Sequence, residues 1–278
     1  MAAMRYPCAA TDRGSHPQMN RPFTALTRRL ALALLACTAV ACTGMGKSPK
    51  TVLVAGATGQ TGMQIVRHLQ QQGYRVRALV RDADKAREQL GADVDYVQGD
   101  VKDAAAVKAA AAGTFAVISS IGARGRDGPD RPEMIDYQGV RNLVDAARAA
   151  RVRQFVLISS RGVTQADHPL NRMFGNVLAW KLKGEDYLRA SGIPYTVVRP
   201  GGLLNEPGGI SDIAFEQGDT PVGTRVLSIP REDVAIVCVE ALRHPEAKNR
   251  TFEIHRLEGP PPSDWQARFA ALRPDPAR

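Results

Sequence analysis

Short apolar runs alternate with amphipathic helical patterns from Thr51 onward, and this alternation constrains the fold more than any other feature of the sequence. The runs are largely apolar and rich in β-branched residues, as in the buried strands of a parallel sheet. Six strands are predicted, at Thr51–Ala55, Arg75–Val80, Val94–Gln98, Phe115–Ser119, Gln154–Ser159 and Tyr195–Arg199. The helices predicted between them are Thr61–Gln72, Ala83–Leu90, Ala104–Ala112, Glu133–Ala150 and Asn176–Ser191. Repeated strand–helix units imply right-handed crossovers, so we expect an α/β fold with a doubly wound, mostly parallel sheet and helices on both faces.

The pattern changes after the sixth strand. A Gly-rich loop at 201–223 is expected there, followed by a short strand at Arg225–Ile229, a helix at Glu232–Arg243 and a last strand at Thr251–His255. We find no internal repeat and no second apolar core, so residues 49–258 are predicted to form a single domain. The segment 259–278 is rich in proline and is predicted to be a frayed tail.

The positive charge of the chain is concentrated at its start. Residues 1–50 carry a net charge of +6 out of the total of +9, which leaves +3 for all the rest. The predicted domain is therefore nearly neutral, and aromatic residues make up only 5% of the chain. Without a basic stripe or aromatic residues for base stacking, a nucleic-acid partner is not expected.

The first 48 residues have the pattern of an export leader. Arg21, Arg28 and Arg29 precede the apolar run Leu30–Ala41, which ends in small residues and is too short to span a bilayer. Met19 would begin a leader of ordinary length. We therefore expect export to the periplasm, and a cytoplasmic location if this leader is not functional.

Two sharper interpretations of the leader stay open beside a plain secretory one. The sequence Ala39–Cys42 resembles a lipobox, which predicts lipidation of Cys42 and membrane attachment, and Leu34–Cys37 is a weaker candidate of the same kind. Thr27–Leu32 contains the Arg-Arg pair of a twin-arginine signal, the export route for folded proteins.

Cysteine and histidine usage gives little sign of special chemistry. Cys8, Cys37 and Cys42 lie in the leader, so Cys238 alone lies in the domain, where it cannot form an internal disulfide. Its apolar helical surroundings predict a buried thiol. The five histidines show no metal-ligand spacing, and no metal is predicted.

The junction of the first strand and first helix carries the strongest motif, in which Gly56, Gly59 and Gly62 are spaced G-x-x-G-x-x-G. Gly56 would allow the sharp exit from the strand, Gly59 the close approach of a pyrophosphate, and Gly62 close packing of the helix. An anion bound there would sit at the helix N-terminus, where free N–H groups favour negative charge. We predict a dinucleotide cradle that also includes Thr58, Gln60 and Thr61.

The end of the second strand indicates which dinucleotide is bound. An NAD site usually places an acidic residue there to hold the ribose 2′-hydroxyl, whereas this chain has Arg81, which can pair with a 2′-phosphate. NADP(H) is therefore predicted, unless Arg81 is only a solvated charge. Asp82 is expected to cap the next helix. Asp100 and Val101, after the third strand, are expected beside the adenine, although Asp100 would equally suit a turn.

These features together resemble a known family. The chain is similar to atypical members of the short-chain dehydrogenase/reductase superfamily, in the NmrA-like, NAD(P)-binding branch with flavin reductase and biliverdin reductase relatives. The resemblance covers about residues 50–257 and implies a Rossmann-like fold. Beyond the glycine motif, it rests on Leu157–Ser160, Trp180–Glu185, Ser191–Gly202 and Ile229–Ala235.

The resemblance also implies active-site residues, with one departure. The family uses a serine after the fifth strand, for which Ser159 and Ser160 are candidates, with Ser160 preferred. It places a lysine four residues before a position matching Glu185, which selects Lys181 as ribose ligand, with Lys183 as the alternative. The catalytic tyrosine would stand four residues before Lys181, at Val177. The usual proton donor is therefore missing.

Positions near the other strand ends complete the predicted site. Ser119 ends the fourth predicted strand, and Pro200 follows the sixth. A cofactor is expected to contact both positions. Tyr187 is expected to pack or to face solvent, and His168 to lie on the surface. The loop 122–132 is either a flap over the cleft or a solvated charge run.

Two functions are compatible with this sequence. One is an NADP(H)-dependent reductase that transfers hydride to a redox-active small molecule, such as a flavin or quinone, that takes its proton from water. The other is a non-catalytic NAD(P)-binding sensor or scaffold. Ser159, Ser160 and Lys181 favour the enzyme, and Val177 favours the second interpretation.

Overall fold

Eight strands form the main sheet of the computed structural model, which describes residues 49–221 and 227–276. Their order is β3-β2-β1-β4-β5-β6-β10-β8, and β8 alone of these eight runs antiparallel to its neighbour. The strands are β1 (Thr51–Ala55), β2 (Arg75–Val80), β3 (Val94–Gln98), β4 (Ala116–Ser119), β5 (Gln154–Ile158), β6 (Tyr195–Pro200), β8 (Asp212–Glu216) and β10 (Arg250–Leu257). This order reverses direction between β1 and β4, as in a Rossmann-like sheet.

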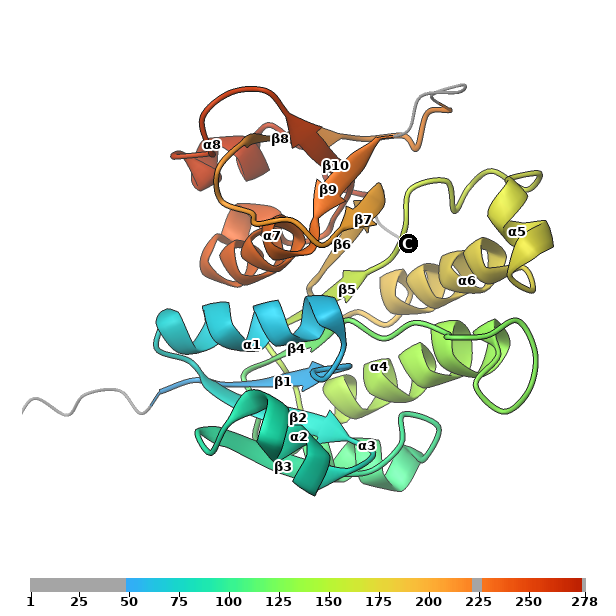
Figure 1. The fold of residues 1–278 in the computed structure, drawn as a ribbon, viewed down its shortest axis with the longest axis vertical. Helices are drawn as coiled ribbons and strands as arrows, with labels where there is room; N and C mark the ends of the chain where they lie inside the picture. Colours follow the sequence, from blue (N-terminus) through green and yellow to red (C-terminus); the bar gives the residue numbers. More distant parts are fainter. Residues whose placement is uncertain (1–48, 222–226, 277–278) are drawn as a thin grey trace, which may run out of the picture. The chain divides into compact units, whose positions relative to one another are not determined.

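Helices cover both faces of the sheet (Figure 1). The face that α1 covers also carries α2 and α7, and the opposite face carries α3, α4 and α6. Their bounds are Gln60–Gln71 for α1, Ala83–Leu90 for α2, Arg231–Arg243 for α7, Ala104–Ala111 for α3, Val140–Ala149 for α4 and Val177–Arg189 for α6. The predicted doubly wound α/β fold is confirmed.

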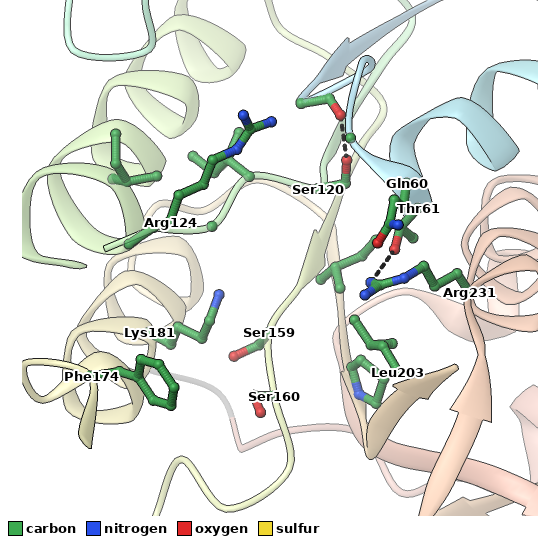
Figure 2. A pocket seen from close by; sticks show the side chains of 18 of the residues that line it. Gln60, Thr61, Ser120, Arg124, Ser159, Ser160, Phe174, Lys181, Leu203 and Arg231 are labelled. Carbon is green, nitrogen blue, oxygen red and sulfur yellow. Dashed lines mark hydrogen bonds between the residues drawn. The ribbon is translucent and has the colours of Figure 1, made fainter. Parts of the chain in front are cut away.

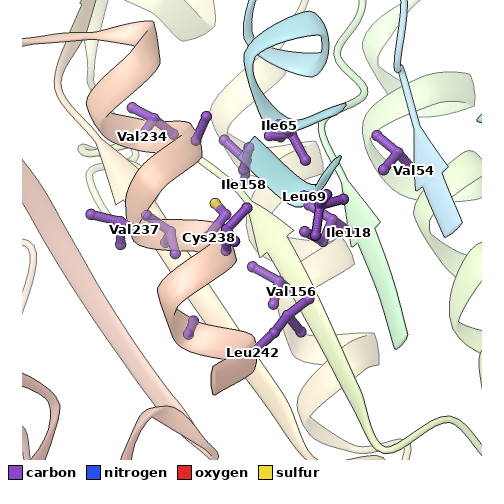
Figure 3. Packing of buried hydrophobic residues seen from close by; sticks show 14 of the residues in the cluster. Val54, Ile65, Leu69, Ile118, Val156, Ile158, Val234, Val237, Cys238 and Leu242 are labelled. Carbon is purple, nitrogen blue, oxygen red and sulfur yellow. The ribbon is translucent and has the colours of Figure 1, made fainter. Parts of the chain in front are cut away.

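The alternation of side chains along each strand explains why the strands are apolar throughout. In β1, Val52 and Val54 pack under α1, whereas Leu53 and Ala55 pack on the opposite face. Figure 3 shows the first of these layers, in which α1 and α7 lie together over β5. Cys238 is fully buried in this layer, and desolvation raises the pKa of its thiol, so it is a core residue as predicted.

The predicted helix at Glu133–Ala150 is divided in two. Its first part is a π-helix, η1 (Glu133–Gly139), and α4 follows directly. The wider turn of a π-helix is often found at functional sites, because it changes which side chains point inward. Here the turn brings the carboxylate of Asp136 beneath the cleft described below.

The C-terminal part contains more regular structure than predicted. The expected Gly-rich loop includes β7 (Gly202–Leu204) and β8, and β7 pairs with β9 (Ser228–Pro230) in a second small sheet. Of the strand expected at Arg225–Ile229, residues 225 and 226 lie outside the described residues. Two further short helices, α5 (Pro169–Met173) and η2 (Pro245–Ala247), are also present.

The prediction of a frayed tail after residue 258 is wrong for the described part. This segment forms α8 (Trp265–Ala270), whose Phe269 is fully buried against Phe215 and Phe252. Beyond α8, Asp275 accepts hydrogen bonds from the hydroxyls of Tyr195 and Thr251, at 2.8 and 2.6 Å. Proline content indicated a loose segment, but aromatic packing and these hydrogen bonds hold it against β10 and β6.

The predicted leader, with Arg28, Arg29 and Cys42, lies outside the described residues. Within residues 49–221 and 227–276, no helix is both long and apolar enough to cross a membrane.

Candidate functional site

A cleft of about 1470 Å³ lies at the carboxyl ends of the parallel strands (Figure 2). Its walls include the segment after β1, the ends of β2 and β3, the loop after β4, and the segments after β5 and β6. It therefore spans the point between β1 and β4 where the strand order reverses, which is where such folds bind nucleotides.

Most of the predicted site residues line this cleft. They are Gly56, Thr58, Gly59, Gln60, Thr61, Arg81, Asp100, Val101, Ser159, Ser160, Lys181 and Pro200. Gly62 stays outside the lining, because its Cα lies against the strand exit: a Cβ there would meet the Gly56 carbonyl oxygen at 2.0 Å. This matches its predicted packing role.

The structure corrects the prediction that Ser119 is a cofactor-binding residue. It is the last residue of β4, its side chain is fully buried in the sheet, and it does not line the cleft. Ser120 is at the cleft instead, and its hydroxyl donates to the carbonyls of Ala55 and Gly56 at 3.3 Å each. A shift of one residue along a strand reverses the direction of the side chain, which accounts for the error.

The N-terminus of α1 is suited to an anion. Gly56 has a φ of +82°, and the N–H of Gly59 donates to its carbonyl at 3.0 Å, which closes the turn. Among the described residues, no side chain caps α1 and no acidic residue lies in its first turn. By contrast, aspartates cap α2, α3 and α8. The free N–H groups of α1 therefore fit the pyrophosphate of a dinucleotide.

At the end of the cleft next to β2 and β3, two cations contact one carboxylate. Asp130, in the loop after β4, accepts from Arg81 at 2.9 Å and from Lys102 at 2.5 Å. The hydrogen bond from Lys102 has the largest effect on the pKa of Asp130. Together with the charges of Lys102 and Arg81 and the hydrogen bond from Arg81, it holds this pKa below its usual value. The Arg81 side chain is 57% exposed, so it can reach an incoming ligand.

The two aspartates near Arg81 have the local roles that were expected. Asp82 caps α2, since its Oδ1 accepts from the N–H of Lys85 at 3.0 Å. The Asp100 Oδ1 accepts from the N–H of Lys102 at 2.9 Å, which makes a turn, and the residue also lines the cleft.

The other end of the cleft contains the predicted catalytic groups. Lys181, on α6, forms an ion pair with Asp136, with 2.7 Å between its Nζ and Oδ1. The Asp136 side chain is fully buried, and its Oδ2 also accepts from the N–H of Ala123 at 3.2 Å. The carboxylate thus fixes the ammonium under the loop after β4, where a Cβ on Gly122 would lie 3.9 Å from Nζ.

The two candidate serines differ in their hydrogen bonds. The Ser160 hydroxyl donates to the carbonyl of Arg161 at 3.0 Å. The Ser159 hydroxyl is buried and has no hydrogen-bond partner among the described residues, although the residue lines the cleft. Figure 2 shows Ser159 and Lys181 on the same side of the cleft. A buried hydroxyl without a partner is costly, so its position suits a bound ligand.

The described residues that line the cleft include no tyrosine. Val177, at the position of the expected tyrosine, begins α6. Tyr187 instead donates to Asp145 of α4 at 2.7 Å, which raises the pKa of its phenol. The alternative lysine, Lys183, lies over the Trp180 ring at 4.1 Å and is not part of the lining.

Several residues of the cleft come from regions that were not predicted as part of the site, or were predicted differently. His168 lines the cleft and caps α5 by accepting from the N–H of Leu170 at 3.2 Å. In the loop 122–132, Arg124 lines the cleft, whereas Arg131 pairs with Glu133. The loop therefore forms part of the wall while carrying some solvated charge.

Two exposed apolar side chains line the cleft from facing walls. Phe174, just after α5, and Leu203, in β7, both line it and are 46% and 37% exposed. Figure 2 places them on opposite sides of Ser159 and Ser160. Exposed large apolar side chains on facing walls are typical of a site for an apolar small molecule.

The fold and the cleft together define a dinucleotide-binding protein of the oxidoreductase type. A family model described as NAD(P)H-binding matches residues 56–245, and the chain belongs to this family. The resemblance to NmrA-like, atypical short-chain dehydrogenases/reductases is thereby confirmed.

Individual relatives agree with this assignment. The chain is 36% identical over 273 residues to an uncharacterised chloroplast protein of Arabidopsis thaliana, covering 90% of this chain and 82% of the relative. It is 34% identical over 241 residues to sanguinarine reductase of Eschscholzia californica, covering 73% and 88%. Among solved structures, the anaerobillin reductase ChuY of Escherichia coli O157:H7 is similar, with a TM-score of 0.63 and 25% identity, over 77% of this chain and 100% of that chain.

Proposed function

We propose that the protein is an NADP(H)-dependent reductase that transfers hydride to a conjugated, redox-active small molecule. The observation that carries this proposal is the buried Ser159 hydroxyl, which has no partner among the described residues and lies on the cleft wall with Lys181. A dinucleotide sensor would need the phosphate cradle and a ribose ligand such as Lys181, but it would have no need for the Ser159 hydroxyl at the far end of the cleft.

The chain's own residues would divide the work as follows. The uncapped N-terminus of α1 would hold the pyrophosphate, and Lys181 would hold the ribose next to the nicotinamide. Asp136 would keep the Lys181 ammonium in place. A bound nicotinamide supplies the hydride. Ser159 would donate a hydrogen bond to the acceptor atom that gains negative charge, and the proton would come from water.

The acceptor class follows from the cleft. Because no tyrosine lines the described cleft, an acceptor whose reduced form takes its proton from water is favoured over a simple ketone. Phe174 and Leu203 favour an apolar molecule. Two relatives are named as reductases of small molecules, sanguinarine and anaerobillin, which supports the same reaction class.

The test is NADPH consumption by the purified chain with a panel of quinones, flavins and dicarbonyls. We expect turnover with at least one quinone or flavin. The Lys181→Ala and Ser159→Ala variants should each lose about 100-fold in kcat/KM, as for loss of a group that stabilises developing charge. Lys183→Ala is the matched control, since Lys183 lies on the same helix but outside the cleft lining, and it should retain wild-type rates. Equal losses in Lys183→Ala and Lys181→Ala would contradict the proposal.

A non-catalytic NAD(P)-binding sensor is the second candidate, and Val177 is the observation that favours it. This function predicts tight dinucleotide binding with no NADPH consumption above the blank for any acceptor in the panel. It also predicts that Ser159→Ala leaves the affinity for the dinucleotide unchanged.

A further inference from the structure

Arg231 reaches the dinucleotide cradle from a distant part of the chain. It is the first residue of α7 and lines the cleft together with Gly59, Gln60 and Thr61. Its Nη1 donates to the Thr61 hydroxyl at 3.3 Å, across 170 residues of sequence. Figure 2 shows this guanidinium directed at the first turn of α1.

The charge of Arg231 has no acidic partner within the described residues. Its two hydrogen-bond partners are neutral, since Nε donates to the amide oxygen of Asn205 at 2.8 Å and Nη1 to Thr61. The residue is half-buried, and desolvation lowers the pKa of its guanidinium. Among the residues that the structure describes, Arg231 is therefore a partly desolvated cation beside the cleft with no anion to offset it.

Neighbouring carboxylates do not neutralise Arg231, because they are engaged elsewhere. Glu232 pairs with Arg67 of α1 and accepts from the N–H of Gly208. Asp233 accepts from the N–H of Gly209 at 2.5 Å. Glu232 is thus directed toward other groups, and Asp233 uses one oxygen for Gly209 while its Oδ2 has no hydrogen-bond partner among the described residues.

The position of Arg231 is also unfavourable for the helices themselves. Glu232 and Asp233 in the first turn of α7 favour its helix dipole, but the Arg231 guanidinium opposes it and approaches the positive end of α1, which has no acidic residue in its first turn. The uncapped positive end of α1 and the Arg231 guanidinium thus lie together in one part of the cleft. This arrangement is stabilised when an anion lies between them.

We infer that Arg231 is a ligand of the dinucleotide pyrophosphate and so links the C-terminal part of the fold to the cradle at α1. This inference rests on the proposed function, because it assumes that a dinucleotide occupies the cleft. A pyrophosphate is common to NAD(H) and NADP(H), so Arg231 contributes affinity without choosing between them, unlike Arg81.

The test compares three probes that share the pyrophosphate: NADPH, NADH and ADP-ribose. Their affinities for the full chain are measured by calorimetric titration. In Arg231→Gln, all three should weaken by the same factor, about tenfold or more, as for loss of a charge-assisted hydrogen bond. Arg231→Lys keeps the charge and should recover part of the loss. The dependence of affinity on salt should be shallower in Arg231→Gln than in the wild type.

Arg243→Gln is the matched control, since Arg243 lies at the other end of α7, pairs with Glu240 and does not line the cleft. Its affinities should equal those of the wild type, and the thermal unfolding of each ligand-free variant verifies that it is folded. Unchanged binding in folded Arg231→Gln would overturn the inference, as would a loss confined to NADPH or to substrate turnover. If the wild type bound none of the three probes, the proposed function itself would fail.

Discussion

At the scale of single residues, we expect the choice between NADP(H) and NAD(H) to depend on competition for two cations. Arg81 and Lys102 both contact the Asp130 carboxylate, so a 2′-phosphate would have to replace that carboxylate. We expect Asp130→Asn to raise NADPH affinity and to leave NADH affinity nearly unchanged. Arg81→Ala should weaken NADPH alone, by about tenfold or more, because a charge-assisted phosphate contact contributes roughly 1.5–3 kcal/mol.

Fluorescence titration of both cofactors checks this prediction. Arg87→Ala is a suitable control, since Arg87 pairs with Asp84 on α2 and does not line the cleft. If Asp130→Asn weakened NADPH binding, the Asp130 carboxylate would hold Arg81 and Lys102 in place for the 2′-phosphate and would not compete with it.

Two glycines of the same motif should respond differently to a side chain. A Cβ on Gly62 would meet the Gly56 carbonyl oxygen at 2.0 Å, whereas one on Gly59 would lie 3.2 Å from it. Gly62→Ala should therefore reduce the free energy of unfolding by about 3 kcal/mol, as for an overpacked site. Gly59→Ala should stay folded and lose dinucleotide binding. Urea denaturation and NADPH titration of both variants decide the matter, and strong NADPH binding by folded Gly59→Ala would place the phosphates elsewhere.

Residues of the site were predictable where one short segment carries the signal. The glycine motif, Arg81 and Lys181 follow fixed distances from strand ends or from one another, and all of them except Gly62 line the cleft. Asp136 gave no local signal, and Arg231 lies in a segment that carries the family resemblance but gave no sign of a role at the cleft. Arg231 matters through Thr61, 170 positions away, and only the closed fold brings the two together.

At the scale of elements, α8 contributes stability that its composition does not indicate. Phe269 is fully buried between Phe215, Phe252 and Trp265. Phe269→Ala should reduce the free energy of unfolding by about 3–5 kcal/mol, as for a large buried aromatic residue. Gln266→Ala, on the exposed side of the same helix, should change it by less than about 1 kcal/mol.

Chemical denaturation gives both values. Similar small effects in the two variants would mean that the segment after residue 258 is frayed after all.

The central strands were predictable because parallel strands buried on both faces are apolar at every position. The bounds of β1, β2 and β3 agree with the prediction at both ends. The β7 and β9 strands have only three residues each, and β8 is an edge strand that depends on its pairing with β10. Such elements are defined by long-range contacts, so local patterns did not separate them from a Gly-rich loop.

At the scale of the whole molecule, the leader predicts where the protein works. Arg28, Arg29, the apolar run to Ala41 and Cys42 predict export with a mature chain that begins at or near Cys42. A protein that folds around its dinucleotide before export would carry the cofactor with it, and the bound ligand would also stabilise the fold. This is the reason to test the twin-arginine interpretation.

Cell fractionation and the intact mass of the native protein test the export prediction. We expect a periplasmic or membrane-bound protein that starts at or near Cys42, and retention in the cytoplasm when Arg28 and Arg29 are both changed to Lys. A cytoplasmic wild-type chain that keeps residues 19–41 would contradict it.

The central claim is that this cleft binds NADP(H), and titration of NADPH and NADH into the full chain tests it most directly. We predict saturable binding of one dinucleotide per chain, with NADPH bound at least about tenfold more tightly than NADH. Binding of both should be lost in Gly59→Ala. Absence of saturable binding by the folded wild type, or undiminished binding by folded Gly59→Ala, would contradict the account.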